Sequence, residues 1–164
     1  MTPRAAAPSI DILVQSPLWN EQPAAEQTVR DAIAAAAASL PDAQRKPNGE
    51  VSVVLTDDAT IRALNKEWRK IDKATNVLSF PAGSNKDVIL GDVVIAYETL
   101  QRECAEEDRV FLHHLAHISV HGFLHLMGYD HETDAEADSM ERLETAVLQR
   151  LGLPDPYLGR ELRD

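Results

Sequence analysis

Residues 121–131 read HGFLHLMGYDH and place three histidines within eleven positions. His121 and His125 are four residues apart, so on a helix both side chains lie on one face and can reach a single ion at about 2.0 to 2.1 Å. Gly128 predicts the end of this helix, because glycine readily adopts the left-handed conformation in which helices end. The chain can then turn back and bring His131 to the pair. The stretch therefore predicts a metal site with three imidazole ligands.

A further histidine, His117, stands one helical turn before His121. It is eight residues from His125, or about 12 Å along the helix axis, so one ion cannot bind both. We expect His117 either to contact the site through a hydrogen bond or to be a partly buried structural histidine. His113 and His114 are expected at the surface or at the boundary of the core.

The predicted ligand set favours a catalytic metal. Three nitrogen ligands without a nearby cysteine are typical of zinc sites that keep one position for water, whereas structural zinc sites are usually closed by four protein ligands. Zinc lowers the pKa of bound water toward about 7, so hydrolysis is the expected reaction class. We expect one zinc ion per chain, although imidazole ligands also suit nickel, copper and iron.

One position disfavours a peptidase. The zinc-peptidase signature H-E-x-x-H carries a glutamate directly after the first histidine, and this glutamate acts as the general base. Gly122 occupies that position here. The histidine spacing is retained and the base is missing, so a zinc metallopeptidase remains only as an alternative.

The same stretch resembles the signature H-G-x-L-H-L-x-G-Y-D-H of the YbeY-type endoribonucleases, the bacterial rRNA maturation factors. Two earlier segments agree with this family: residues 64–81, with LN, WR and TNVLSFP, and residues 90–92, LGD. The resemblance covers about residues 50–157. It departs from the family where Trp68 stands in place of a common tyrosine and Ala74 in place of a common proline.

The resemblance implies a zinc-dependent, single-strand-specific endoribonuclease that acts in 16S rRNA 3′-end maturation and ribosome quality control. It implies that His121, His125 and His131 bind the metal. It also implies that Arg69, the arginine before TNVLSF, is needed for activity. Arg69 fits on chemical grounds as well, because a planar guanidinium can hold a phosphate by two parallel hydrogen bonds. The implied partners are single-stranded rRNA and the small ribosomal subunit or an assembly protein.

Other polar residues near these motifs have two interpretations each. Asp130 either orients a ligand imidazole or caps the turn, and Asp92 is either a similar orienting group or a structural residue. The resemblance places Thr75, Asn76 and Ser79 beside the cleft, where they could meet the RNA backbone. No general base is apparent, and either water or the RNA 2′-hydroxyl can be the nucleophile. A non-catalytic ribosome-assembly factor with a structural zinc stays open as a further alternative.

The overall charge disfavours binding of nucleic acid by general attraction, because the net charge is −11 and the pI is about 4.9. Basic residues are concentrated in residues 62–73, which form a strip that can face RNA: Arg62, Lys66, Arg69, Lys70 and Lys73. Acidic residues are concentrated in residues 131–144: Glu132, Asp134, Glu136, Asp138, Glu141 and Glu144. We interpret the acidic segment as an ordinary solvated helix face.

Length and composition predict one domain in a reducing compartment. A chain of 164 residues can bury a core without disulfides, and its single cysteine, Cys104, excludes an internal one. The apolar stretches are too short for a signal peptide core or a membrane span, so we expect a soluble, cytoplasmic protein. We expect residues 1–8 to be disordered, residues 9–158 to form the endoribonuclease domain and residues 159–164 to form a tail.

Hydrophobic periodicity predicts an α+β domain with a roughly four-stranded mixed sheet and about five helices. The spacing of His121 and His125 makes one of these helices similar to the metal-bearing helix of the zincins. Strands are predicted at residues 10–14, 51–55, 77–80 and 88–96, with a turn at 82–85. Helices are predicted at residues 23–40, from 57 or 58 onward, and at 98–106, 109–127 and 133–151. The second helix is expected to carry Ile61, Leu64 and Trp68 on one face.

Overall fold

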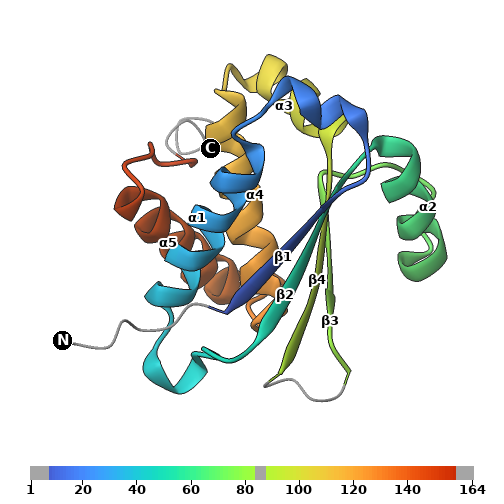
Figure 1. The fold of residues 1–164 in the computed structure, drawn as a ribbon. Helices are drawn as coiled ribbons and strands as arrows, with labels where there is room; N and C mark the ends of the chain where they lie inside the picture. Colours follow the sequence, from blue (N-terminus) through green and yellow to red (C-terminus); the bar gives the residue numbers. More distant parts are fainter. Residues whose placement is uncertain (1–7, 84–87, 158–164) are drawn as a thin grey trace.

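The computed structural model describes residues 8–83 and 88–157. These residues form an α+β domain in which a four-stranded mixed sheet packs with five α-helices, as predicted (Figure 1). The expected disorder of residues 1–8 and the expected tail at 159–164 fall outside the described residues, apart from residue 8. The predicted turn at 82–85 falls partly outside them.

The sheet contains β1 (Ser9–Val14), β2 (Glu50–Thr56), β3 (Val77–Pro81) and β4 (Ile89–Ala96), in the order β1-β2-β4-β3. The strands β1, β2 and β4 are parallel, and β3 pairs with β4 in the antiparallel direction. β3 therefore forms one edge of the sheet, where half of its backbone groups point away from the ladder and can bind groups from other elements.

The α-helices are α1 (Ala25–Ser39), α2 (Asp58–Arg69), α3 (Tyr97–Glu107), α4 (Phe111–Leu126) and α5 (Asp134–Arg150). Short 3₁₀-helices at Pro17–Glu21 and Asp42–Gln44 were not predicted; each is too short to show a periodic pattern. In the described ranges, no helix combines the length and the apolar character that crossing a membrane requires.

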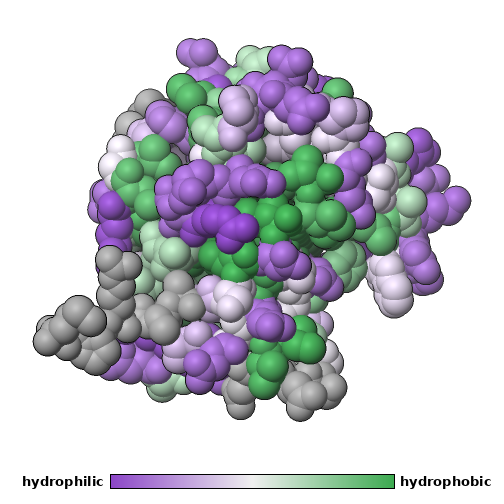
Figure 2. Space-filling model, viewed as in Figure 1, coloured by the Kyte–Doolittle hydropathy of each residue, from purple (hydrophilic) through white to green (hydrophobic). Residues whose placement is uncertain are grey.

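The helices form unequal layers on the sheet. α1, α4 and α5 lie on one side and α2 lies alone on the other, beside β3 and β4 (Figure 1). α4 is central, and large side chains such as Leu115, Phe123 and Leu124 are fully buried in the main core. Where α2 does not cover the second face, apolar residues including Leu13 remain at the surface. Figure 2 shows a patch of apolar surface near the middle of the view.

α2 is fixed at its beginning by a side-chain cap. The Asp57 carboxylate accepts a hydrogen bond of 2.9 Å from the Thr60 backbone N–H, and this bond lowers the pKa of Asp57. The helix ends at Arg69, and the next residue, Lys70, adopts the left-handed conformation with a φ of 62°. α2 is therefore closed at both ends, and its last residue, Arg69, has a defined position.

The predicted apolar face of α2 is only partly correct. Ile61 is fully buried and Leu64 is partly buried, but Trp68 is 62% exposed. Ile61 packs in the small cluster that includes Leu78, whereas the turn that carries Trp68 lies beside the Phe80 ring at the edge of the sheet. The periodicity of the helix is correct, but Trp68 lies at the edge strand β3, where its ring contacts Phe80 and remains largely exposed.

α4 approaches the sheet closely at Gly122. A Cβ atom at this position would lie 2.8 Å from Val93 Cγ1 and 3.1 Å from Val77 Cγ2. The Ser79 hydroxyl donates a hydrogen bond of 2.8 Å to the Gly122 carbonyl. The helix backbone and the edge strand are therefore in direct contact, and the position has no room for a side chain.

This contact predicts that Gly122→Ala destabilises the protein. The added methyl would meet two stiff β-branched side chains, at a cost of about 3 kcal/mol, and the better helix propensity of alanine would return about 1 kcal/mol. We expect the free energy of unfolding, measured by urea denaturation, to fall by about 2 kcal/mol. Gly83→Ala is the matched control, because no atom lies within 4 Å of its added Cβ. Equal stability of the two variants would contradict the prediction.

Candidate metal centre

The structure brings the three predicted ligands together. His121 and His125 lie on one face of α4, and one ring nitrogen from each of these residues and from His131 lies within 4.8 Å of the others. The Nε2 atoms of His121 and His125 are 3.1 Å apart. Two nitrogens at 2.0 to 2.1 Å from one tetrahedral ion are about 3.3 Å apart, so the spacing suits a shared ion.

The turn that delivers His131 forms as predicted at Gly128, which has a φ of 94°. The Tyr129 N–H donates to the Leu124 carbonyl at 3.0 Å, which closes the end of α4. The Asp130 carboxylate accepts a hydrogen bond of 2.8 Å from the His131 backbone N–H. Of the two roles left open for Asp130, the structure therefore shows the capping role.

The electrostatics of the cluster keep His125 in the form that binds metal. Burial lowers the pKa of His125, and the neighbouring imidazoles of His121 and His131 lower it further. A metal ligand must be the neutral imidazole, which has a free lone pair. The cluster thus reduces competition from protons for the proposed ligand.

A buried carboxylate orients His121. Glu144, on α5, is 0% exposed, and its two oxygens lie 2.7 Å from His121 Nδ1 and 3.1 Å from His117 Nε2. Burial would raise the pKa of Glu144, but the hydrogen bonds from the two histidines outweigh this effect and lower the pKa to about 2. The carboxylate holds a proton on His121 Nδ1, so Nε2 keeps the lone pair that faces His125.

The interpretation of residues 131–144 as a solvated face is wrong for Glu144. The other acidic residues from Glu132 to Asp138 are exposed, as expected. Glu144 instead lies on the buried face of α5. Met140 precedes it by four residues, and Val147 and Leu148 follow it by three and four, so all of them share one face of the helix. The position of this carboxylate within an apolar stripe could have indicated its burial from the sequence, but the acidic residues around it obscured the pattern.

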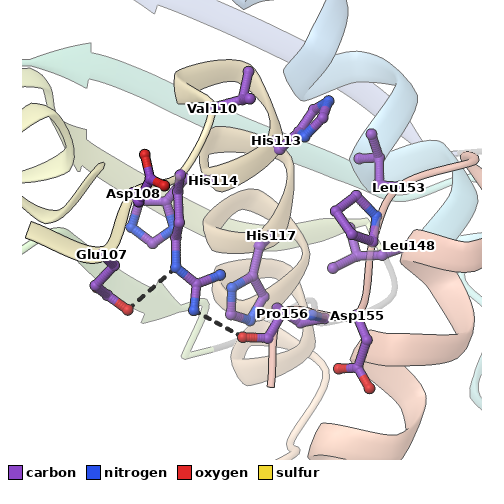
Figure 3. A pocket seen from close by; sticks show the side chains of 12 residues that line it. Glu107, Asp108, Val110, His113, His114, His117, Leu148, Leu153, Asp155 and Pro156 are labelled. Carbon is purple, nitrogen blue, oxygen red and sulfur yellow. Dashed lines mark hydrogen bonds and ion pairs between the residues drawn. The ribbon is translucent and has the colours of Figure 1, made fainter. Parts of the chain in front are cut away.

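His117 combines its two predicted roles, because it is partly buried and also reaches the site through Glu144. The Tyr157 hydroxyl donates to Glu144 and lies 3.2 Å from His117 Nε2. Arg109 fixes the segment before this tyrosine by donating to the Pro156 carbonyl at 2.8 Å. Figure 3 shows this junction, a pocket of about 320 Å³ in which His117 lies close to Pro156.

His114 was expected at the surface or boundary but is buried, with 6% exposure. Its Nε2 lies 2.9 Å from a carboxylate oxygen of Glu103 on α3, which also accepts a bond of 3.2 Å from the Asn76 amide. α3 packs over the first turns of α4 and supplies the partner that makes this burial possible. His113 is only partly buried, in agreement with the boundary position predicted for it.

The three histidines line one wall of a cleft of about 550 Å³. Thr75, Asn76 and Ser79 line the same cleft from β3 and the segment before it, where the resemblance placed them. The Ser79 hydroxyl is bonded to α4 and the Asn76 amide to Glu103, so both side chains have fixed positions.

Arg69 also lines this cleft. Its Nη2 donates a hydrogen bond of 2.7 Å to the Ser79 carbonyl at the free edge of β3, and its Cζ lies 5.7 Å from the centre of the Phe80 ring. A guanidinium carries five N–H donors, so this bond leaves others for a ligand. The cleft thus combines three nitrogen ligands with a positioned cation, an arrangement that suits an anionic substrate.

Asp92 cannot orient a ligand. It pairs in register with Phe80, and the neighbouring pair, Val93 and Ser79, faces α4. Successive residues of a strand point to opposite faces, so exposed Asp92 points away from the metal cluster. The orienting role considered for Asp92 was wrong, and a structural role is the remaining interpretation.

Fold and site together define an α+β protein with a candidate three-histidine metal centre. The family model described as Endoribonuclease YbeY matches residues 16–152. A protein of Bradyrhizobium sp. (strain BTAi1 / ATCC BAA-1182) named Endoribonuclease YbeY is 52% identical, covering 99% of each chain. One of the same name from Nitrobacter winogradskyi is 49% identical, covering 96% of this chain and 86% of the relative. The chain belongs to the YbeY family, as the resemblance predicted.

A solved structure supports the fold. The solution structure of TM1509 from Thermotoga maritima has a TM-score of 0.54 and 21% sequence identity, and the match covers 90% of this chain and 97% of that chain. The likeness extends over nearly the whole described domain.

The contact between Glu144 and His121 predicts that Glu144→Gln weakens metal binding. The amide offers a weaker acceptor to the ligand imidazole, so we expect the zinc dissociation constant to rise about 10- to 100-fold. Competition with a chromophoric chelator measures this change. Asp138→Asn is the matched control, because Asp138 is an exposed acidic residue of the same helix. An unchanged zinc affinity in folded Glu144→Gln would contradict the assigned role.

Proposed function

We propose that this protein is a zinc-dependent, single-strand-specific endoribonuclease that acts in 16S rRNA 3′-end maturation and ribosome quality control in the cytoplasm. The observation that carries the proposal is the position of Arg69, which lines the same cleft as the three clustered histidines. The name shared by relatives of about 50% identity supports the nuclease activity. We further propose that residues 9–158 form the single endoribonuclease domain.

In this proposal His121, His125 and His131 hold one zinc ion. The ion supplies a Lewis acid for a phosphoryl oxygen and a means of activating water at neutral pH. Glu144 keeps the His121 ring in the required tautomer and orientation. In this proposal the reactive phosphate lies against the three histidines, and the buried contact between Glu144 and His121 fixes the geometry of this wall.

Arg69 binds the scissile phosphate from the other side of the cleft. Its guanidinium matches two phosphate oxygens and stabilises the charge that builds on them as the pentavalent phosphorus forms. Thr75, Asn76 and Ser79 form the wall along which the RNA backbone lies. Water and the RNA 2′-hydroxyl are both possible nucleophiles, and the product ends distinguish them: a 5′-phosphate for water and a 2′,3′-cyclic phosphate for the 2′-hydroxyl.

The geometry at Gly122 argues against the peptidase alternative. The glutamate of H-E-x-x-H would have to replace Gly122, where an added Cβ would collide with Val77 of β3 and Val93 of β4. The acidic net charge favours weak affinity for free RNA, so we also propose that the small ribosomal subunit or an assembly protein directs the nuclease to its site.

The proposed roles predict different effects for two substitutions. Arg69→Gln should keep near-stoichiometric zinc and lower kcat about 10²- to 10³-fold, because it removes a group that stabilises the transition state. His125→Ala should lose both zinc and cleavage. Elemental analysis and cleavage of single-stranded rRNA by folded, purified variants measure these effects, with Lys46→Gln as a control outside the cleft.

Two results would contradict the nuclease proposal. Cleavage that persists in both variants would be the activity of a contaminant. A folded wild-type protein that binds zinc and leaves RNA intact, while His125→Ala unfolds, would favour an assembly factor in which zinc is structural.

A further inference from the structure

Trp68 is the most exposed large apolar side chain among the described residues, at 62%. The other tryptophan, Trp19, is 3% exposed and donates its indole N–H to the Thr56 carbonyl at 2.9 Å. Tryptophan is usually highly buried, so the position of Trp68 in solvent requires an explanation. It is also the residue directly before Arg69, which lines the cleft.

Phe80 supports both of these side chains. The Trp68 ring meets the Phe80 ring at 69°, with the ring centroids 6.5 Å apart, and the Arg69 guanidinium carbon lies 5.7 Å from the Phe80 centroid. Arg69 is further fixed by its bond to the Ser79 carbonyl. The indole and the guanidinium therefore have a defined relation at the free edge of β3.

This arrangement suits an RNA strand that crosses the edge of the sheet. The Trp68 ring and the Arg69 guanidinium lie against the same Phe80 ring, so a strand whose phosphate is bound by Arg69 can place a neighbouring base on Trp68. Single-stranded RNA is commonly bound by stacking its bases on exposed aromatic rings, and stacking tolerates any base. Lys66, Lys70 and Lys73 in the same segment add positive charge for the phosphates.

We propose that Trp68 is a stacking platform for a base of the single-stranded substrate, adjacent to the phosphate that Arg69 binds. The inference rests on the proposed nuclease function and deepens it by assigning a base-binding residue. It gives a physical reason for single-strand specificity, because a base that is paired within a duplex cannot lie on the indole face.

A surface that binds a protein partner would consist of several apolar side chains and not of one aromatic ring beside cations. Ile71 is 52% exposed near the same end of α2, and a protein interface would use both apolar side chains. The adjacent cations and the cleft favour RNA. Ile71→Ala is therefore the matched control, since it removes an exposed apolar group without a π-face.

Fluorescence tests binding independently of cleavage. The chain has two tryptophans, so emission excited at the red edge of tryptophan absorption, where tyrosine does not absorb, reports on Trp68 and Trp19 alone. A single-stranded 2′-O-methyl oligonucleotide, verified as intact on a gel, should quench the wild-type emission and protect it from acrylamide. Trp19→Phe should retain the RNA-dependent quenching, and Trp68→Phe should lose it.

Kinetics test the contribution to the reaction. Trp68→Ala should raise KM for a short single-stranded RNA about tenfold and leave kcat within about twofold, as the loss of one stacked base predicts. Trp68→Phe, which keeps an aromatic face, should fall between the wild type and Trp68→Ala. Ile71→Ala should match the wild type. Circular dichroism confirms that each variant is folded.

The failure of this inference is distinguishable from the failure of the nuclease proposal. An unchanged KM in Trp68→Ala, together with loss of activity in Arg69→Gln, would overturn the stacking role and leave the nuclease proposal intact. Equal weakening by Trp68→Ala and Ile71→Ala would also overturn it and favour a general apolar contact. Absence of both cleavage and quenching in the wild type would overturn both proposals.

Discussion

The close approach of α4 to the sheet at Gly122 is the constraint on which the site depends. The Gly122 backbone contacts Ser79, and the absent Cβ leaves room for Val93. His121 precedes this contact on the helix, and β3 forms the facing wall of the cleft. A helix held farther from the sheet by a side chain would separate the histidines from Arg69. The same glycine stands where a zinc peptidase carries the glutamate of H-E-x-x-H, so one packing requirement both shapes this cleft and leaves no room for that carboxylate.

Most of the fold was predictable because it follows from local patterns. Alternating and helical periodicities, with Asp57 as a cap and Gly128 as a terminator, predicted the limits of the α-helices and strands to within two residues, apart from the end of α2, for which no limit was predicted. The three clustered histidines were predictable for the same reason, since two are related by a single helical turn and the third by a turn at glycine. Family resemblance, and not periodicity, directed attention to Arg69.

The residues that were predicted incorrectly depend on contacts between distant segments. Glu144 belongs to an acidic run, and only the packing of α5 against α4 decides that this carboxylate is buried against His121. His114 is buried because α3 brings Glu103 to it, and Trp68 is exposed because it lies at the edge of the sheet, against Phe80 of β3. In each case the helix was predicted correctly, but the neighbouring element determined whether the side chain is buried or exposed.

The two sides of the cleft differ in a way that resolves the conflict between an acidic protein and an anionic substrate. On the α4 and α5 side, the carboxylate that contacts a proposed ligand is Glu144, which is buried and accepts hydrogen bonds from imidazoles. Asp130 and Glu132 also line the cleft on this side. On the α2 side, Arg62 is paired with Asp72 at 2.8 Å, while Arg69 donates to a backbone carbonyl and lines the cleft. A polyanion therefore meets positive charge in one limited region, on the α2 side of the cleft. Because few phosphates can be contacted there, such a protein gains little affinity from charge alone, and a preference for RNA must come mainly from the geometry of the cleft.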